Sequence, residues 1–398
     1  MRQAALLLCL AAVAARADDA ADAGSPASGT PEVEQLADEM DQRFQEVKEA
    51  VKAAAPGNTH FLLSGYGFGQ FDKKQGPARS MAAGLALIAL WQLSDRLFTE
   101  AELEVELGEG GAELGLEYVN LTFAANDYLF ITGGLMLAPV GTWAERYHAP
   151  WINKLPDAPL GLGHDALVPE SILGLQARGA LPLGPTKLSY SLWVAGGGQL
   201  NLGAENPKEA GQLSFATFTV PRDVAFGGQV GFYPLPTLEL DYSIYRSGVG
   251  AGANATVHAF SGSWFVDSPA LKGTLDLRAE ALLSFVDAVT YDPAGELGLG
   301  PLRFDNRRIA GYVQAAYRPT RLGVVLDRLE LVVRGDLLVT PVEAPESEQV
   351  RRLTTGLDVW VGQSTALKLA YQLTRRIEGN EMEATLEHGF KAQLVMGF

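Results

Sequence analysis

The side chains best suited to chemistry are concentrated in residues 138–170, which read APVGTWAERYHAPWINKLPDAPLGLGHDALVPE. Acids, bases and histidines occur there together, so this segment could transfer protons or hold ions. Proline and glycine recur through it, and neither helical nor strand periodicity is present. A loop of this length within a compact domain is uncommon, and usually it is either functional or a sign that the assignment of elements is wrong. The candidate residues are Glu145, Arg146, His148, Lys154, Asp157 and Asp165.

The spacing of these residues disfavours catalysis and cofactor binding. The histidines of the chain form neither HExxH nor another metal-ligand spacing. A Ser-His-Asp arrangement with His148 or His164 would need a nucleophile, and no motif fixes one. The glycines of residues 65–69 lie inside a predicted strand that no helix follows, which is not the context of a nucleotide-binding loop. We therefore expect no enzyme activity, no metal site and no cofactor.

The first seventeen residues have the features of a secretory signal peptide. Arg2 supplies the basic start, residues 4–15 form an apolar run, and the small residues Ala15 and Ala17 favour cleavage after Ala17. Cys9 is the only cysteine and lies within this segment. The exported chain would therefore contain no thiol, which excludes disulfides and cysteine-ligated metal sites.

Charge and hydrophobicity narrow the class of protein. The formal net charge is −16 at pH 7, and removal of Arg2 and Arg16 with the signal peptide would make it −18. Nucleic-acid binding is not expected, because it needs a basic surface. Hydrophobic residues make up 47% of the chain, yet no uninterrupted apolar run after the signal reaches about 18 residues. A large soluble β protein and a transmembrane β-barrel remain.

Two segments precede the main domain. Residues 18–29 are small, acidic and turn-forming, which is typical of a flexible linker. Residues 30–56 predict a helix that Thr30 can cap and that Pro56 and Gly57 would end. Its apolar stripe could form a short coiled coil with other copies or could pack on the domain. The stripe consists of Val33, Leu36, Met40, Phe44, Val47, Val51 and Ala54.

Residues 57–398 are predicted to form an all-β domain, a transmembrane barrel of sixteen antiparallel strands. Each strand is about 11–15 residues long, which suits tilted membrane strands better than soluble ones. Short and long connections alternate, as in outer-membrane barrels, and the long ones are 138–170, 201–221 and 287–305. The predicted strands are 59–71, 81–93, 97–107, 112–125, 127–137, 171–182, 186–200, 222–234, 237–247, 255–267, 273–286, 306–318, 329–339, 351–362, 365–377 and 384–398.

Within these strands, apolar and charged residues alternate. Charges spaced along one face can persist only where that face meets water, so we assign them to the lumen and the apolar set to lipid. A soluble β protein would have the opposite arrangement, and alternation alone does not exclude it. The candidate lumen residues are Glu102, Glu104, Arg278, Glu280, Arg308, Glu330, Arg334, Asp336, Lys368 and Lys391.

The last strand carries a pattern that favours the barrel. Apolar residues at alternate positions lead to a terminal aromatic, which resembles the signal by which the barrel-assembly machinery recognises outer-membrane proteins. The residues that carry this pattern are Phe390, Leu394, Met396 and Phe398. We therefore expect export to the outer membrane of a Gram-negative bacterium, with membrane lipid around the barrel.

One stretch resembles a known family. Residues 133–160, GGLMLAPVGTWAERYHAPWINKLPDAPL, are similar to the glycine-rich strand, Pro-x-Gly turn and Glu-Arg-x-His of the phosphate-selective porin O and P type, within the wider group of bacterial porins. The rest of 59–398 matches only as barrel periodicity. The resemblance implies passive diffusion through a water-filled barrel and a homotrimer. The chain is acidic and has no basic cluster of the kind a phosphate filter needs, so phosphate selectivity is not expected.

The function predicted from the sequence is an outer-membrane porin for small hydrophilic solutes or ions. Residues 138–170 would be the third extracellular loop, which in porins commonly folds inward. Opposed charges there would create a transverse field in the pore. Alternatively, Glu145 and Arg146 pair with each other or with the wall and only hold the loop. The mixed signs predict weak selectivity. The competing function is a non-conducting barrel, an adhesin or a structural protein.

Overall fold

The computed structural model describes residues 60–76, 79–108, 110–163, 167–204, 206–215, 223–293, 300–320, 328–362, 364–379 and 384–398. The predicted signal peptide, linker and helix of residues 30–56 lie outside these ranges, as do His164 and Asp165. No helix among the described residues is long and apolar enough to cross a membrane.

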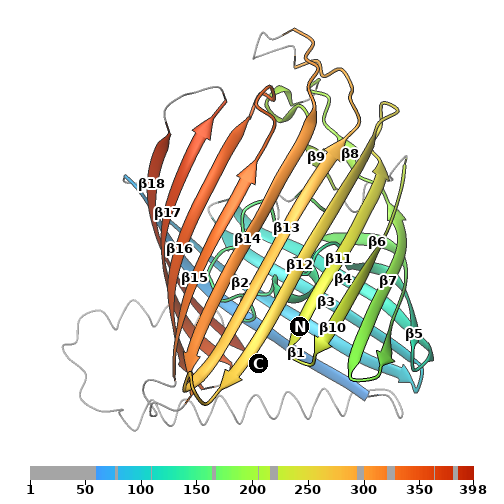
Figure 1. The fold of residues 1–398 in the computed structure, drawn as a ribbon, viewed down its shortest axis with the longest axis vertical. Helices are drawn as coiled ribbons and strands as arrows, with labels where there is room; N and C mark the ends of the chain where they lie inside the picture. Colours follow the sequence, from blue (N-terminus) through green and yellow to red (C-terminus); the bar gives the residue numbers. More distant parts are fainter. Residues whose placement is uncertain are drawn as a thin grey trace, which may run out of the picture. The chain divides into compact units, whose positions relative to one another are not determined.

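Sixteen antiparallel strands in the described part of the chain close into a barrel, in which β1 pairs with β18 (Figure 1). The barrel closes without a gap, so the sixteen-stranded fold predicted from the sequence is confirmed. The strands are β1 His60–Lys74, β2 Arg79–Ser94, β3 Leu97–Gly108, β4 Gly111–Asn126, β5 Leu129–Leu137, β6 Ser171–Leu183, β7 Thr186–Gly196, β10 Val224–Leu235, β11 Leu238–Gly248, β12 Asn254–Ser268, β13 Gly273–Val286, β14 Asn306–Pro319, β15 Leu329–Val339, β16 Glu348–Val361, β17 Thr365–Glu378 and β18 Thr385–Gly397.

One predicted strand is wrong in its extent. The segment 186–200 was expected to be continuous, but β7 ends at Gly196 and Gln199–Leu200 form a separate strand, β8, which pairs with β9, Leu213–Ser214. The break falls at two consecutive glycines. The amide of Gly198 donates to Ser247 Oγ at 3.2 Å, and a Cβ on Gly197 would lie 2.4 Å from the same oxygen. The backbone therefore leaves the barrel at a point that a side chain could not occupy.

The two faces of the wall have opposite polarity. On β15, Leu331 and Val333 are exposed on the outside, whereas Glu330, Arg334 and Asp336 are buried on the inside. Large apolar side chains are exposed in the same alternating way around the barrel. This is the inverse of a soluble β protein, and it suits a wall with lipid outside and polar groups within.

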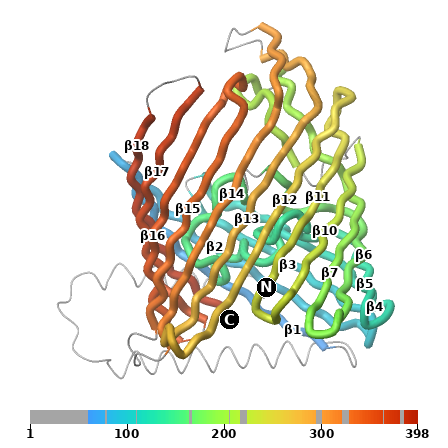
Figure 2. Tube along the Cα trace, viewed as in Figure 1, coloured from blue at the N-terminus to red at the C-terminus, as the bar shows by residue number. Residues whose placement is uncertain are grey.

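The long connections gather at one end of the barrel, which Figure 2 shows at the top. The β8–β9 hairpin packs there against residues 287–293 and 300–305, where Tyr291 stacks on Phe304 at a centroid distance of 4.5 Å. Ala344, from the connection between β15 and β16, joins the same apolar cluster. The neighbouring loops thus support one another.

The connection between β5 and β6, residues 138–170, follows a different course. Its apolar side chains pack against inward-facing residues of the wall and form the largest buried cluster. Trp143 contacts Tyr312 of β14 edge-to-face, at a centroid distance of 6.2 Å. Figure 2 shows this segment between the two sides of the barrel. The loop therefore lies against the inner face, where it can meet the charged side chains of the strands.

Candidate functional site

The loop of residues 138–170 is closed at its base and then anchored at three places. The Ala138 amide donates to the Glu170 carbonyl at 2.8 Å, which joins the two ends beside β5 and β6. Between these ends lies a π-helix, η1 Trp143–Tyr147. π-helices are rare and occur mostly as single turns, frequently at functional sites. Each anchor connects the loop to at least one strand that lies far away in the sequence.

The first anchor is the carboxylate of Glu280 on β13. Its Oε2 accepts hydrogen bonds from the Thr142 amide, the Thr142 hydroxyl and the Trp143 amide, at 3.0, 2.9 and 3.1 Å. Gly141 precedes them with a φ of +73°, and a Cβ there would lie 1.9 Å from Glu280 Oε1. Only glycine fits at position 141, because this φ is strained for other residues and the Glu280 carboxylate fills the space that a Cβ would need.

The second anchor surrounds η1. Arg146 pairs with Glu239 of β11, and Glu145 lies 3.7 Å from Arg178 of β6. Burial lowers the pKa of Arg146, but the hydrogen bond and charge of Glu239 raise it by more, so the guanidinium keeps its charge. The Arg278 guanidinium lies over the Tyr147 ring, with its central carbon 4.0 Å from the ring centroid. Glu145 and Arg146 therefore pair with side chains of the wall.

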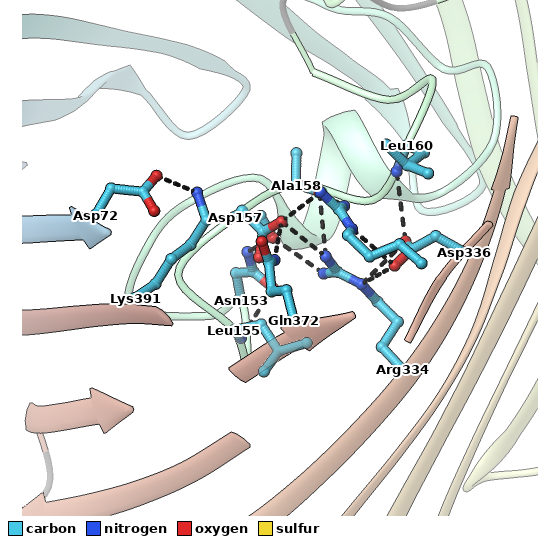
Figure 3. Close-up of polar contacts among 11 residues, drawn as sticks. Asp72, Asn153, Leu155, Asp157, Ala158, Leu160, Arg334, Asp336, Gln372 and Lys391 are labelled. Atoms are coloured by element: carbon cyan, nitrogen blue, oxygen red, sulfur yellow. Dashed lines mark hydrogen bonds and ion pairs between the residues drawn. The ribbon is translucent and has the colours of Figure 1, made fainter. Parts of the chain in front are cut away.

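The third anchor is Asp157, which pairs with two arginines on neighbouring strands. Figure 3 shows its contact with one of them, Arg334. Its Oδ2 lies 2.9 Å from Arg352 of β16 and 3.4 Å from Arg334 of β15. Gln372 of β17 donates to the same oxygen at 2.8 Å. Burial raises the pKa of Asp157, but Arg334, Arg352 and then Lys391 lower it by more, so its pKa lies below the usual value.

Backbone carbonyls of the loop complete this third anchor. Arg334 donates to the carbonyls of Asp157 and Ala158 at 2.9 and 3.1 Å, and Arg352 donates to Ala158 at 2.9 Å. Asp336 accepts from the Leu160 amide at 3.3 Å and pairs with Arg334 at 3.0 Å. Figure 3 shows these groups converging from the loop and from the wall. Carboxylate, guanidinium and carbonyl groups thus form one connected network.

Two lysines hold the segment between the second and third anchors. Lys154 pairs with Glu330 of β15 at 2.8 Å, and Trp360 donates to the other oxygen of that carboxylate at 3.0 Å. Lys368 of β17 is almost fully buried and donates to the carbonyls of Pro150 and Asn153. The loop therefore makes polar contacts with strands from β10, where Gln229 donates to it, to β17, where Gln372 does.

The candidate residues named from the sequence fall into three groups. Glu145, Arg146, Lys154 and Asp157 lie in the loop and reach the wall, and neither ring nitrogen of His148 bonds to a described residue. His164 and Asp165 lie outside the described residues. The ten wall candidates all lie on inward-facing positions: Glu102, Glu104, Arg278, Glu280, Arg308, Glu330, Arg334, Asp336, Lys368 and Lys391.

Several inward-facing residues of the site were missed. Arg352 and Gln372 hold Asp157, and Glu239 holds Arg146. Asp241 lies next to Glu239 on the same face of β11 and is 6% exposed. Glu239 and Asp241 occupy alternate positions of their strand, and this pattern could have identified both as lumen-facing residues. Arg352 follows Arg351, so two adjacent charges obscured which of them faced the lumen.

Cavities lie on both sides of the loop. The larger, of about 1000 Å³, opens toward the long-loop end and is lined by residues that include Glu117, Glu170 and Arg308. A second, of about 470 Å³, lies near the short turns and is lined by residues that include Gln92, Glu100 and Arg178. No group of histidine, cysteine, aspartate or glutamate residues that could hold a metal ion occurs in the described ranges.

Comparison with known proteins supports this architecture. No protein-family model matches the sequence, and no curated protein does either. Among solved structures, the outer membrane channel DcaP of Acinetobacter baumannii aligns over 86% of this chain and 99% of its own, with a TM-score of 0.56 and 13% identity. An anion-selective porin from Comamonas acidovorans aligns over 86% and 100%, with a TM-score of 0.53 and 12% identity.

A third neighbour is the trimer form of OmpT, an outer membrane protein of Vibrio cholerae. It aligns over 86% of this chain and 100% of its own, with a TM-score of 0.50 and 11% identity. Likeness at such low identity concerns the fold. The chain therefore has the sixteen-stranded barrel fold of the bacterial outer-membrane porins.

Proposed function

We propose that the protein is an outer-membrane porin through which small hydrophilic solutes or ions diffuse passively. The observation that carries this proposal is the closed barrel with an apolar outer face and a charged inner face. A barrel of sixteen strands is wide enough to leave an aqueous channel unless something narrows it. The cavities on both sides of the loop are consistent with a water-filled path.

We further propose that residues 138–170 form the constriction. In support, the loop contacts inward-facing residues on strands from β10 to β17. It also reaches the first two strands, where Ala149 packs with Tyr66 and Ala86. A loop with partners on opposite sides of the lumen reduces the open cross-section. The mixed charges named from the sequence, Glu145, Arg146, Lys154 and Asp157, would then line or support the narrow region.

The location and assembly of the protein belong to the same proposal. The apolar exterior suits outer-membrane lipid, and the alternating residues of the last strand suit recognition by the barrel-assembly machinery. A homotrimer is supported by the trimer form of OmpT, which has a similar fold. Kinship with the phosphate-selective O and P type rests on residues 133–160, so membership of the wider porin group is the better-supported proposal.

Planar-bilayer recording of the purified full-length protein tests the pore. We expect stepwise increases in conductance as single barrels insert. Insertion is checked separately by heat-modifiable mobility on gels, so that a failure to fold is recognised. A folded, inserted barrel that gives no conductance steps at any voltage would exclude the pore. It would favour the non-conducting alternative, an adhesin or structural barrel whose lumen the loop fills.

A further inference from the structure

Most basic side chains on the wall that faces the loop are engaged with carboxylates or with carbonyls of the loop, whereas Arg308 of β14 bonds to Asn306. Arg334 and Arg352 bind Asp157 and Asp336, and Arg278 pairs with Asp276 at 2.6 Å. Lys368 is almost fully buried under the loop carbonyls. Lys391 pairs with Asp72 of β1, also at 2.6 Å. These cations are therefore compensated by groups of the protein, and little of their charge remains to attract a passing anion.

The opposite wall carries a row of acids without such compensation. Glu100, Glu102, Glu104 and Glu106 occupy alternate positions of β3 and face the lumen. Alternate residues of a strand lie roughly 7 Å apart, so the row extends for about 20 Å. Glu102 accepts a hydrogen bond from Tyr66 at 2.8 Å, and Glu100 accepts one from Asn120 at 3.1 Å. Within the described ranges, no lysine or arginine forms an ion pair with any of the four.

The row connects the two cavities. Glu100 lines the cavity of about 470 Å³ near the short turns. Glu117 of β4 lies beside Glu102 and Leu103 in the register of the two strands, and with Glu170 it lines the cavity of about 1000 Å³. Further glutamates of the larger cavity are Glu209, Glu346, Glu348 and Glu378, whereas its arginines are Arg308 and Arg376. Arg376 already pairs with Glu348. A solute crossing the barrel therefore passes carboxylates in both cavities and along β3.

A separate buried acid also lacks compensation. Asp241 faces the lumen on β11 and is 6% exposed, yet neither of its carboxylate oxygens has a hydrogen-bond partner. Its neighbour Glu239 is bound by Arg146. A buried carboxylate without a partner is costly unless a positive group approaches it. Acidic groups on two sides of the lumen thus point to the same class of solute.

We propose that this lumen passes cations in preference to anions and that the β3 carboxylates determine the preference. The inference rests on the proposed pore function and names its substrate class as small cationic solutes. Rows of one charge sign select ions of the other sign. Charges spaced by less than the Debye length of about 8–10 Å act together on a passing ion. The anion-selective porin from Comamonas acidovorans has a similar fold, so the selectivity of this chain comes from its side chains.

The reversal potential in a tenfold KCl gradient tests the proposal, with the full-length protein in planar bilayers. We expect the wild type to favour K⁺ over Cl⁻. We expect Glu100→Gln/Glu106→Gln, at the two ends of the row, to lower the K⁺/Cl⁻ permeability ratio by at least about threefold. Coulomb attraction at roughly 7 Å in water gives about that factor for one carboxylate. A wild type that favours Cl⁻, or a ratio unchanged in the double variant, would overturn the proposal.

Two controls separate charge from structure. Glu343→Gln removes one carboxylate charge from an exposed loop at the same end, and Glu343 lines neither cavity, so the ratio of this variant should stay at the wild-type value. Glu100→Asp/Glu106→Asp keeps both charges and should retain most of the selectivity. If the aspartate pair loses as much selectivity as the glutamine pair, the carboxylate charge is not the determinant and the inference fails. Absence of any channel would instead overturn the pore proposal, and this inference with it.

Discussion

The two sides of the lumen differ in how their charges are used. On the wall from β13 to β17, arginine, lysine and carboxylate side chains bind one another and the loop, with Asp157 between Arg334 and Arg352 as the clearest case. On β3, the four glutamates have no cationic partner in the described part of the chain. The loop touches the β1–β2 side through apolar residues such as Ala149. The wall from β13 to β17 thus holds the loop, whereas the carboxylates of β3 are available to interact with solutes.

The largest expected effect comes from releasing the loop from the wall that holds it. Asp157→Asn removes the charge that Arg334 and Arg352 share, and breaking a buried ion pair costs about 3–5 kcal/mol. We expect the loop to detach and the single-channel conductance to rise. Selectivity should shift toward anions, because the two arginines lose one of the two carboxylates that compensate their charge and keep only Asp336. Single-channel recording measures both quantities. Asp95→Asn, in an exposed short turn, is the matched control. Unchanged conductance in Asp157→Asn would show that this anchor does not hold the loop.

A smaller effect is expected at the start of the loop. Gly141→Ala places a Cβ against Glu280 Oε1 at a residue whose φ is +73°, so the hydrogen bonds to Thr142 and Trp143 should weaken. Gly250→Ala imposes a comparable strain, with a φ of +85°, but meets no atom within 4 Å. Limited proteolysis of the loop should therefore be faster in Gly141→Ala than in Gly250→Ala. Equal rates would mean that strain alone, and not the approach to Glu280, decides the outcome.

The smallest effect is a dependence on acid pH. The pKa of Asp157 is lower in the folded protein than in the unfolded chain, so its contribution to loop attachment is present above the unfolded pKa and is lost as pH falls through the folded pKa. The conductance difference between wild type and Asp157→Asn should therefore persist from pH 7 to about pH 4 and disappear only below that. Recording both proteins over this range measures it. A difference that vanishes near pH 6 would contradict the lowered pKa.

The sequence was sufficient to predict the strands of the barrel wall. Period-two alternation, as in Glu330, Arg334 and Asp336, located the strands to within a few residues and assigned their inward faces. The break after Gly196 escaped prediction, because the contact of Gly197 with Ser247 joins residues 50 positions apart, and periodicity describes only neighbours.

The partners of the loop were also beyond prediction from the sequence. Asp157 was a candidate, but Arg334 and Arg352 lie 177 and 195 residues away, and only closure of the barrel brings them together. The sign of the uncompensated charge could not be predicted for the same reason. Counting both signs in the sequence predicted weak selectivity. Which charges remain available depends on which pairs form across the lumen, as between Lys154 and Glu330.

The pairing of β1 with β18 also affects how the barrel assembles. Ser64 bonds to the carbonyl of Phe398, a sequence separation of 334 residues, whereas the other neighbouring barrel strands are consecutive along the chain. Contacts between distant residues form slowly, because chain entropy opposes them until late in folding. Until then, β1 and β18 each present an unpaired edge that can join the edge of another chain. The last junction to form is therefore the one at which a nascent barrel is most open to mispairing.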